Sequence, residues 1–149
     1  MIIKFSNFAD GVHQLEFQEK TEKIGLKQPF FDDLFLAVDM DKSHSQIVIK
    51  GNLSVKAKYI CDRCDDEFVE ELKNNFQITY FFTNQYTQKN EDVNLYYLSP
   101  EKDKIDLTND VRDFALLAEP MKKLCKPDCK GLCYKCGANL NVEECNCEK

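Results

Sequence analysis

The chain has 149 residues, of which 43% are hydrophobic, and a formal net charge of −6. This length predicts one domain with a tail, and the acidic balance argues against a surface that attracts nucleic acid as a whole. No apolar run approaches the ~20 residues that span a membrane, and the first ten residues lack the apolar core of a signal peptide. We therefore expect a cytoplasmic protein with reduced thiols and no membrane partner.

Alternating and aromatic residues predict a mostly antiparallel β-sheet in the first half of the chain. Val55, Ala57 and Tyr59 alternate with lysines, as is typical of a half-buried strand. The Cys61/Cys64 pair then falls at a corner between two strands. The expected strands cover residues 2–8, 12–17, 34–40, 46–53, 54–60 and 68–82, with turns at 42–45, a bend or bulge at 51–52, and a polar loop at 83–94.

Residues 106–119 change to a helical period. Asp106 or Thr108 is placed to cap this helix, and Pro120 is placed to end it. Its apolar face consists of Leu107, Val111, Phe114, Ala115 and Ala118. The sequence thus predicts an α+β fold: a mostly antiparallel, barrel-like body over residues 1–120 with one main helix. A cysteine-rich, zinc-binding tail over residues 121–149 is expected to pack on this body.

Eight cysteines dominate the candidate chemistry, and six of them lie in the last 25 residues. Zinc is held by four thiolates in a tetrahedron. The turn Cys133-Tyr-Lys-Cys136 suits two of these ligands, because Gly137 can take the positive φ that turns backbone amides toward sulfur. Cys61-Asp-Arg-Cys64 is a second such turn, with Asp65 in place of the glycine.

The cysteines can fill one or two Zn²⁺ sites, and the sequence leaves their grouping open. The simplest division places on one ion Cys133, Cys136, Cys145 and Cys147. It places on the other ion Cys61, Cys64, Cys125 and Cys129. A ribbon that joins the Cys61/Cys64 turn to the Cys133/Cys136 turn is equally allowed.

Two redox-active alternatives use the same cysteines. Cys129, Cys133 and Cys136 have the spacing that holds an iron–sulfur cluster in radical SAM enzymes, but the motif stands at the end of a short chain with no helix–strand alternation after it. Cys61 and Cys64 have the spacing of a thiol–disulfide enzyme, but the acidic residues that follow would raise a thiolate pKa. No catalytic motif is found, so no catalytic residue is assigned.

Basic residues cluster around the first cysteines of the tail. They either offset the charge of thiolate sites or form a small patch that contacts the phosphates of RNA. The members of this patch are Lys122, Lys123, Lys126, Lys130 and Lys135, with Arg63 at the tip of the middle cysteine turn.

Taken together, these motifs resemble a known family. The tail reads L-C-KPD-C-KGL-C-YK-C-GANLN-x4-C-x-C, and the middle motif reads Cys61-Asp-Arg-Cys64-Asp-Asp-Glu-Phe68. Both are similar to motifs of the YceD-like family of bacterial and plastid large ribosomal RNA subunit accumulation proteins. The helix before the tail is similar too, and the match extends from about residue 46 onward.

The resemblance implies a non-enzymatic role in large-subunit ribosomal RNA accumulation and ribosome assembly. Its implied partners are ribosomal RNA or a pre-ribosomal particle, and ribosomal or assembly proteins. Two other functions stay open: a zinc-ribbon-like adaptor for proteins or nucleic acids in transcription, and a C-x-x-C thiol redox protein.

Overall fold

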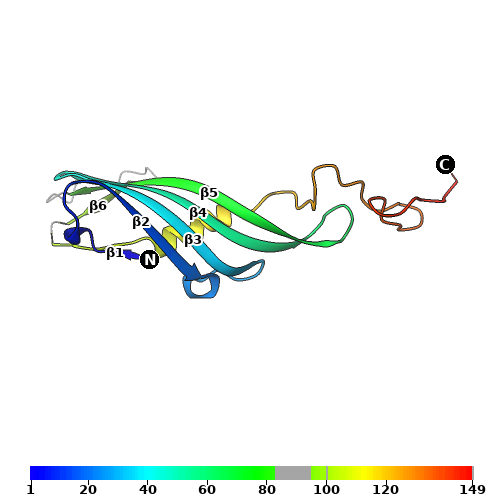
Figure 1. Ribbon diagram of the computed structural model, residues 1–149, viewed down its shortest axis with the longest axis horizontal. Helices are drawn as coiled ribbons and strands as arrows, with labels where there is room; N and C mark the ends of the chain where they lie inside the picture. The colour runs from blue at the N-terminus through cyan, green and yellow to red at the C-terminus, as the bar shows by residue number, and fades with distance from the viewer. Residues whose placement is uncertain (83–94, 100, 149) are drawn as a thin grey trace.

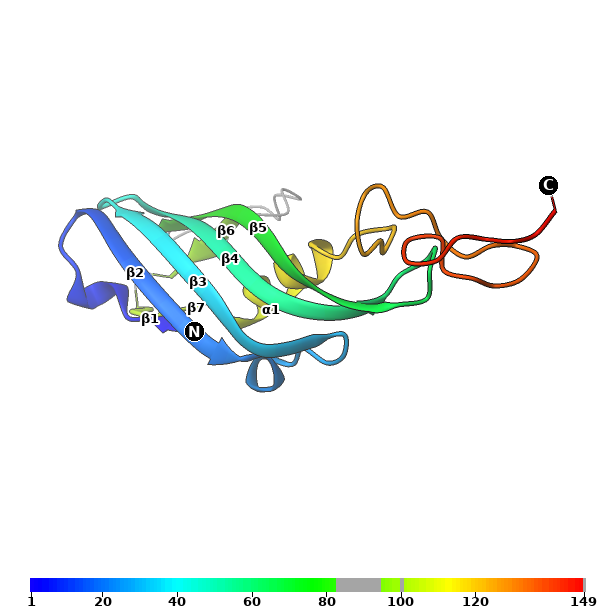
Figure 2. The ribbon, with the colours of Figure 1, turned by 45° about the vertical axis from the view of Figure 1, so that its right-hand side comes forward.

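A five-stranded sheet in the order β2-β3-β4-β5-β6 curves over a single helix (Figures 1 and 2). The computed structural model describes residues 1–82, 95–99 and 101–148. The sheet strands are β2 Gly11–Lys20, β3 Phe30–Lys42, β4 Gln46–Ile60, β5 Glu67–Phe82 and β6 Leu95–Leu98. The remaining elements are β1 Ile2–Ile3, η1 Phe5–Asn7, η2 Thr21–Ile24, β7 Ile105–Asp106 and α1 Thr108–Leu117.

The expected, mostly antiparallel sheet is confirmed, but the expectation of a barrel-like body is wrong. Strands β2 to β5 form consecutive antiparallel pairs, whereas β6 pairs with β5 in parallel. Strands β2 and β6 are the two edges of the sheet and do not pair with each other. The apolar face is covered instead by α1 and by the antiparallel pair β1–β7, which join one core with the sheet. The expected loop at 83–94 lies outside the described residues.

Strand β4 runs without interruption through Gly51, where the sequence predicts a bend or bulge. Gly51 lies directly opposite Phe76 of β5, whose ring lies over the glycine. A Cβ on Gly51 would stand 2.3 Å from the Phe76 Cζ atom. On its far side, the Phe76 ring stacks on Phe114 of α1, with centroids 4.6 Å apart. The glycine therefore makes room for the aromatic pair that seats the helix on the sheet.

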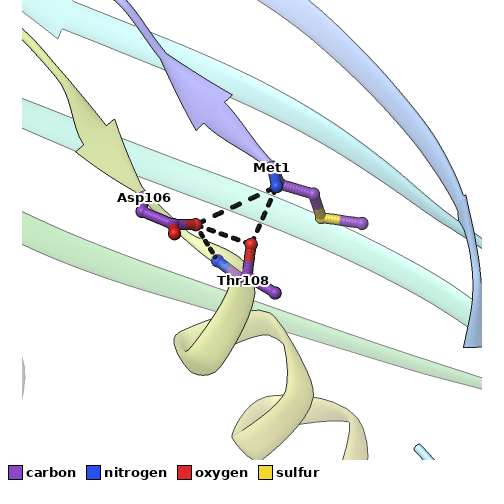
Figure 3. A network of polar contacts seen from close by, with 3 residues as sticks. All are labelled: Met1, Asp106 and Thr108. Carbon is purple, nitrogen blue, oxygen red and sulfur yellow. Dashed lines mark hydrogen bonds and ion pairs between the residues drawn. The ribbon is translucent and has the colours of Figure 1, made fainter. Parts of the chain in front are cut away.

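The start of α1 is fixed by contacts with the first residue of the chain (Figure 3). The Met1 α-amino group donates to Thr108 Oγ1 at 2.8 Å and lies 3.9 Å from Asp106 Oδ1. That carboxylate oxygen accepts hydrogen bonds from the Thr108 hydroxyl and backbone N–H at 2.6 and 2.9 Å. The hydroxyl hydrogen bond is the main cause of the lowered pKa of Asp106. These contacts explain why residues 2–8 are not one strand: Ile2–Ile3 pairs with β7, and a 3-10 turn follows.

Within residues 1–82, 95–99 and 101–148, no helix is both long and apolar enough to cross a membrane.

Candidate metal centres

The eight cysteines gather into two groups of four, each with its sulfur atoms within 4.8 Å of one another. The hairpin–tail site contains Cys61 and Cys64 from the β4–β5 hairpin and Cys125 and Cys129 from the tail. The tail site contains Cys133, Cys136, Cys145 and Cys147. The structure thus brings the cysteines together in the simplest division that the sequence allows, and not in the ribbon joining the two C-x-x-C turns.

The hairpin–tail site has the dimensions of a zinc tetrahedron. Cys61 Sγ lies 3.8 Å from Cys129 Sγ, and Cys64 Sγ lies 3.7 Å from Cys125 Sγ. A tetrahedron with Zn–S bonds of ~2.3 Å has edges of about 3.8 Å. A disulfide would need a separation of about 2.05 Å, and all four thiols are free. Two sulfur pairs thus match the edges of a four-coordinate zinc site, and the remaining pairs lie within 4.8 Å.

The tail site is similar in size and more open to solvent. Cys145 Sγ lies 3.2 Å from Cys133 Sγ and 3.7 Å from Cys136 Sγ. Cys136 is exposed, whereas three of the four cysteines in the hairpin–tail site are buried. This difference in burial indicates that the two sites contribute differently to the stability of the fold. Cys61, Cys64 and Cys129 of the hairpin–tail site form a small buried core of their own, whereas all four cysteines of the tail site belong to the tail.

The turn at Cys61 is a knuckle closed by backbone hydrogen bonds. The Cys61 N–H donates to the Asp66 carbonyl at 2.9 Å, and the Asp65 N–H donates to the Cys61 carbonyl at 3.1 Å. Asp65 has a φ of +58°, a left-handed conformation that aspartate tolerates better than most residues. Aspartate therefore performs the conformational role for which the sequence pattern would favour glycine.

The turn at Cys133 repeats this geometry in the tail. The Cys133 N–H donates to the Ala138 carbonyl and the Gly137 N–H donates to the Cys133 carbonyl, both at 2.8 Å. Gly137, with φ of +75°, occupies the place that Asp65 takes in the hairpin. The Lys135 N–H also donates to Cys133 Sγ at 3.4 Å. Each site therefore combines one knuckle with a second, differently spaced cysteine pair.

Backbone amides favour the thiolate at the first cysteine of each knuckle. Burial opposes ionisation of Cys61, but N–H groups of Cys125, Arg63 and Cys64 outweigh it and lower the Cys61 pKa to about 6. At Cys133, the Cys136 amide is the main cause that lowers the pKa to about 6.

A thiolate already formed in each site makes further ionisation harder. Hydrogen bonding with Cys145 is the main cause that raises the pKa of Cys147 to about 12. The Asp66 amide favours the Cys64 thiolate, but burial and the neighbouring sulfurs together raise the Cys64 pKa. A cluster whose first thiolate forms easily and whose later ones need a cation has the chemistry of a metal site.

Direct hydrogen bonds also dock the tail on the hairpin. The Asp62 N–H donates to the Lys123 carbonyl at 2.7 Å, and the Lys123 N–H donates to Asp62 Oδ2 at 2.8 Å. The Leu132 N–H donates to the Arg63 carbonyl at 3.0 Å. Figure 1 shows the result: after α1 the chain runs to the end of the β4–β5 hairpin and beyond it to the C-terminus.

The basic residues assigned by sequence to an RNA patch divide into two kinds. Arg63 is engaged within the protein, because its Nη1 donates to the Cys129 carbonyl at 2.9 Å. The Lys123 ammonium lies 5.2 Å from the centre of the Tyr59 ring, and Lys135 donates to the Glu148 carbonyl and lies over Tyr134. The lysines without a side-chain partner among the described residues are Lys122, Lys126 and Lys130, all exposed.

Asn141 is a contributor that sequence reasoning missed. Its Nδ2 donates to Cys129 Sγ at 3.3 Å, and its Oδ1 accepts from the Lys130 N–H at 2.9 Å. It therefore fixes one sulfur of the hairpin–tail site from the segment between the two pairs of the tail site. Asparagine between cysteines carries no spacing signal, so only the folded tail reveals this contact.

Comparison with known proteins places these motifs in a family. The family described as large ribosomal RNA subunit accumulation protein YceD matches residues 49–149. The chloroplastic YCED homolog 1 of Arabidopsis thaliana is 24% identical over 139 residues, which cover 75% of this chain and 43% of the relative. The Zea mays homolog 1 is 40% identical over 58 residues, which cover 38% of this chain and 20% of the relative. This chain thus spans less than half the length of these relatives, and no solved structure matches it significantly.

Proposed function

Because this chain belongs to the YceD family of large ribosomal RNA subunit accumulation proteins, we propose that it supports accumulation of that RNA as a non-enzymatic assembly factor. Its partners are large-subunit ribosomal RNA, free or in a pre-ribosomal particle, and the proteins bound to it. In this proposal each four-cysteine site holds one structural Zn²⁺, so the loaded protein contains two. The protein acts in the compartment where its ribosomes are assembled.

The observation that carries the structural role is the complete ligand set of each site. The four sulfurs of each site lie within 4.8 Å of one another, so a zinc ion bound by all four would have no coordination place left for water or substrate. Catalytic zinc sites keep such a place open, whereas structural sites close it with four protein ligands. The same closure disfavours a thiol redox enzyme, since Cys61 and Cys64 are engaged with two further sulfurs and not with each other alone.

The proposed RNA contact lies at the free lysines of the tail. Lys122, Lys126 and Lys130 flank the hairpin–tail site at exposed positions and have no ion-pair partner in the described ranges. Closing the site fixes the backbone that carries them, because Cys125 and Cys129 lie within the same short segment. Three lysines on single-stranded RNA predict a shallow salt dependence, with a log–log slope of about −2.

The experiment combines a cellular and a biochemical measurement. Deletion of the gene in its native organism should lower the ratio of large- to small-subunit ribosomal RNA, and the wild-type chain should restore it. Metal analysis of the purified chain should give two zinc ions. An unchanged RNA ratio in the deletion strain would refute the assembly role, and iron or absence of metal in protein purified without chelators would refute the zinc assignment.

A lysine variant tests the contact separately. Replacing Lys122, Lys126 and Lys130 by glutamine should weaken binding to large-subunit RNA and flatten its salt dependence. The matched control replaces three exposed lysines elsewhere on the protein, Lys27, Lys50 and Lys73. Because both variants lose the same charge, an equal effect from the control would show that the position of the tail lysines does not matter.

A further inference from the structure

Strand β2 is a long edge strand with one side open. It has ten residues, Gly11–Lys20, and β3 is the one described strand that pairs with it. Strands in globular proteins average about five to six residues. Its outer side therefore carries an extended row of backbone N–H and C=O groups that no strand in the described part of the chain pairs with.

Two usual protections of an edge strand, a bulge and a proline, are missing from β2. Its pairing with β3 is continuous from Gly11 to Lys20, without a bulge, and it contains no proline. Natural proteins block edge-to-edge pairing with bulges, prolines or inward-pointing charges. The one acidic residue on the core side of β2, Glu19, has its charge offset by Lys23 at 3.1 Å. An edge without a bulge or a proline leaves its backbone available to a partner strand.

The core side of β2 is also incompletely covered. Leu15 and Phe17 pack against the core cluster but are only partly buried. Every core-facing residue of β2 is partly exposed, whereas the core-facing residues of the central strand β4 are buried. A strand added beside β2 would extend the sheet and cover this row.

The sequence of β2 is complementary to itself in one register. If Leu15 faces Leu15 of an antiparallel copy, Asp10 faces Lys20 at both ends of the pair. Gln14 then faces Glu16, and no two like charges are opposed. In a register centred on Glu16, the Glu16 carboxylates of the two chains would face each other, and directly opposed like charges destabilise antiparallel pairs. Registers centred on Gln14 or Phe17 oppose no like charges but also pair no opposite ones. Among the alignments that overlap most of the strand, the Leu15-centred one therefore has the most favourable charges.

We infer that β2 is a homodimer interface, where two copies of this chain pair their edge strands antiparallel about Leu15 to form one continuous ten-stranded sheet. The Lys20 end of β2 lies toward the β4–β5 hairpin, because Lys20 pairs with Asp33 and Phe30 of the same strand pairs with Ala57. An antiparallel pair therefore sends the two cysteine-rich tails to opposite ends of the dimer. The tails, which carry the proposed RNA contact, stay clear of the interface.

Sedimentation of the full, zinc-loaded chain over a range of micromolar concentrations tests the inference. The mass should correspond to two chains at high concentration. Lys20→Asp should weaken the dimer about tenfold, because two symmetric pairs change from attraction to repulsion. Asp10→Lys should weaken it similarly, and the double variant should recover wild-type association, since the exchanged charges again face each other.

The charge exchange separates association from folding. Asp10 and Lys20 are exposed, and thermal unfolding verifies that each variant folds. A chain that stays monomeric at every concentration would overturn the inference. A dimer that withstands both single substitutions, or that the double variant fails to rescue, would equally exclude this interface. Ribosomal RNA accumulation is measured separately, so a failure here leaves the proposed function intact.

Discussion

The two candidate metal sites are expected to contribute differently to stability, and paired cysteine substitutions can separate their contributions. Cys125→Ser/Cys129→Ser removes the tail ligands of the hairpin–tail site. Cys145→Ser/Cys147→Ser removes two ligands of the tail site. Each double variant should bind one zinc ion in place of two, because the other site keeps all four sulfurs.

The size of each effect follows from the chain that each site closes. Cys64 and Cys125 are 61 residues apart, and a cross-link over that distance contributes about 4 kcal/mol through the lost freedom of the unfolded chain. Cys133 and Cys145 are 12 residues apart, which corresponds to about 3 kcal/mol. The stabilisation by the hairpin–tail site also reaches the sheet, because one half of that site belongs to the β4–β5 hairpin. All four ligands of the tail site belong to the tail, so its stabilisation reaches the sheet only indirectly, for instance through the hydrogen bond from Asn141 to Cys129.

Denaturant unfolding followed by circular dichroism of the sheet measures the first effect. The Cys125/Cys129 variant should lose about 4 kcal/mol of unfolding free energy, and the Cys145/Cys147 variant less than about 1 kcal/mol. Hydrogen exchange locates the change. The Asp62 amide, which donates to the Lys123 carbonyl, should exchange faster only in the first variant.

A substitution in the same turn serves as the control. Lys126→Ser changes an exposed residue between Cys125 and Cys129 and should alter neither metal content nor unfolding. The reasoning is refuted if both cysteine variants destabilise the sheet equally. It is also refuted if loss of the hairpin–tail site leaves exchange in the hairpin unchanged.

Three further substitutions test the packing around the helix and the tail. Gly51→Ala should destabilise the protein by about 1–3 kcal/mol in thermal unfolding, because its Cβ would stand 2.3 Å from Phe76 Cζ; an unchanged Tm would contradict this packing. Thr108→Val removes the hydroxyl that lowers the Asp106 pKa, so stability at neutral pH should fall by about 1 kcal/mol. A carboxyl group with a lowered pKa stabilises the fold at pH values above the ordinary carboxyl pKa, and this stabilisation is lost as pH falls through the pKa of the folded state. The difference in unfolding free energy between the variant and wild type should therefore shrink in acid, and a difference that stays constant with pH would exclude the link. Gly131 has a φ of +77°, and a Cβ there would stand 3.0 Å from the Arg63 carbonyl oxygen of the hairpin. Gly131→Ala should therefore weaken tail docking by about 1–2 kcal/mol, seen as faster hydrogen exchange in the tail; unchanged exchange would count against that contact.

Local patterns made the knuckles and the helix predictable. The C-x-x-C turn needs a left-handed residue after its second cysteine, and Gly137 indicates that conformation directly. Asp65 adopts the same left-handed conformation at the other knuckle. Aspartate tolerates this conformation but does not indicate it as glycine does, so the second turn was harder to predict. The helix was likewise predicted within two residues at each end, since its apolar period and Pro120 are local signals.

Long-range pairing was harder to predict, because nothing local encodes it. The grouping of Cys61 and Cys64 with Cys125 and Cys129 depends on how the tail returns to the hairpin. The open sheet and its parallel β6 depend on what covers the apolar face. Gly51 shows the same limit: its local sequence suggests a bend, whereas its role is to admit a ring from the neighbouring strand.

The charge of the loaded tail limits how it can meet RNA. Residues 121–148 carry five lysines and four carboxylates, and each zinc bound by four thiolates adds a formal charge of about −2. The loaded tail is therefore net negative and does not draw RNA from a distance. Its lysines can act only at short range, where their positions decide the contact. In the proposed function, zinc would therefore act through shape, because it would hold a few lysines in a fixed arrangement at the end of the sheet.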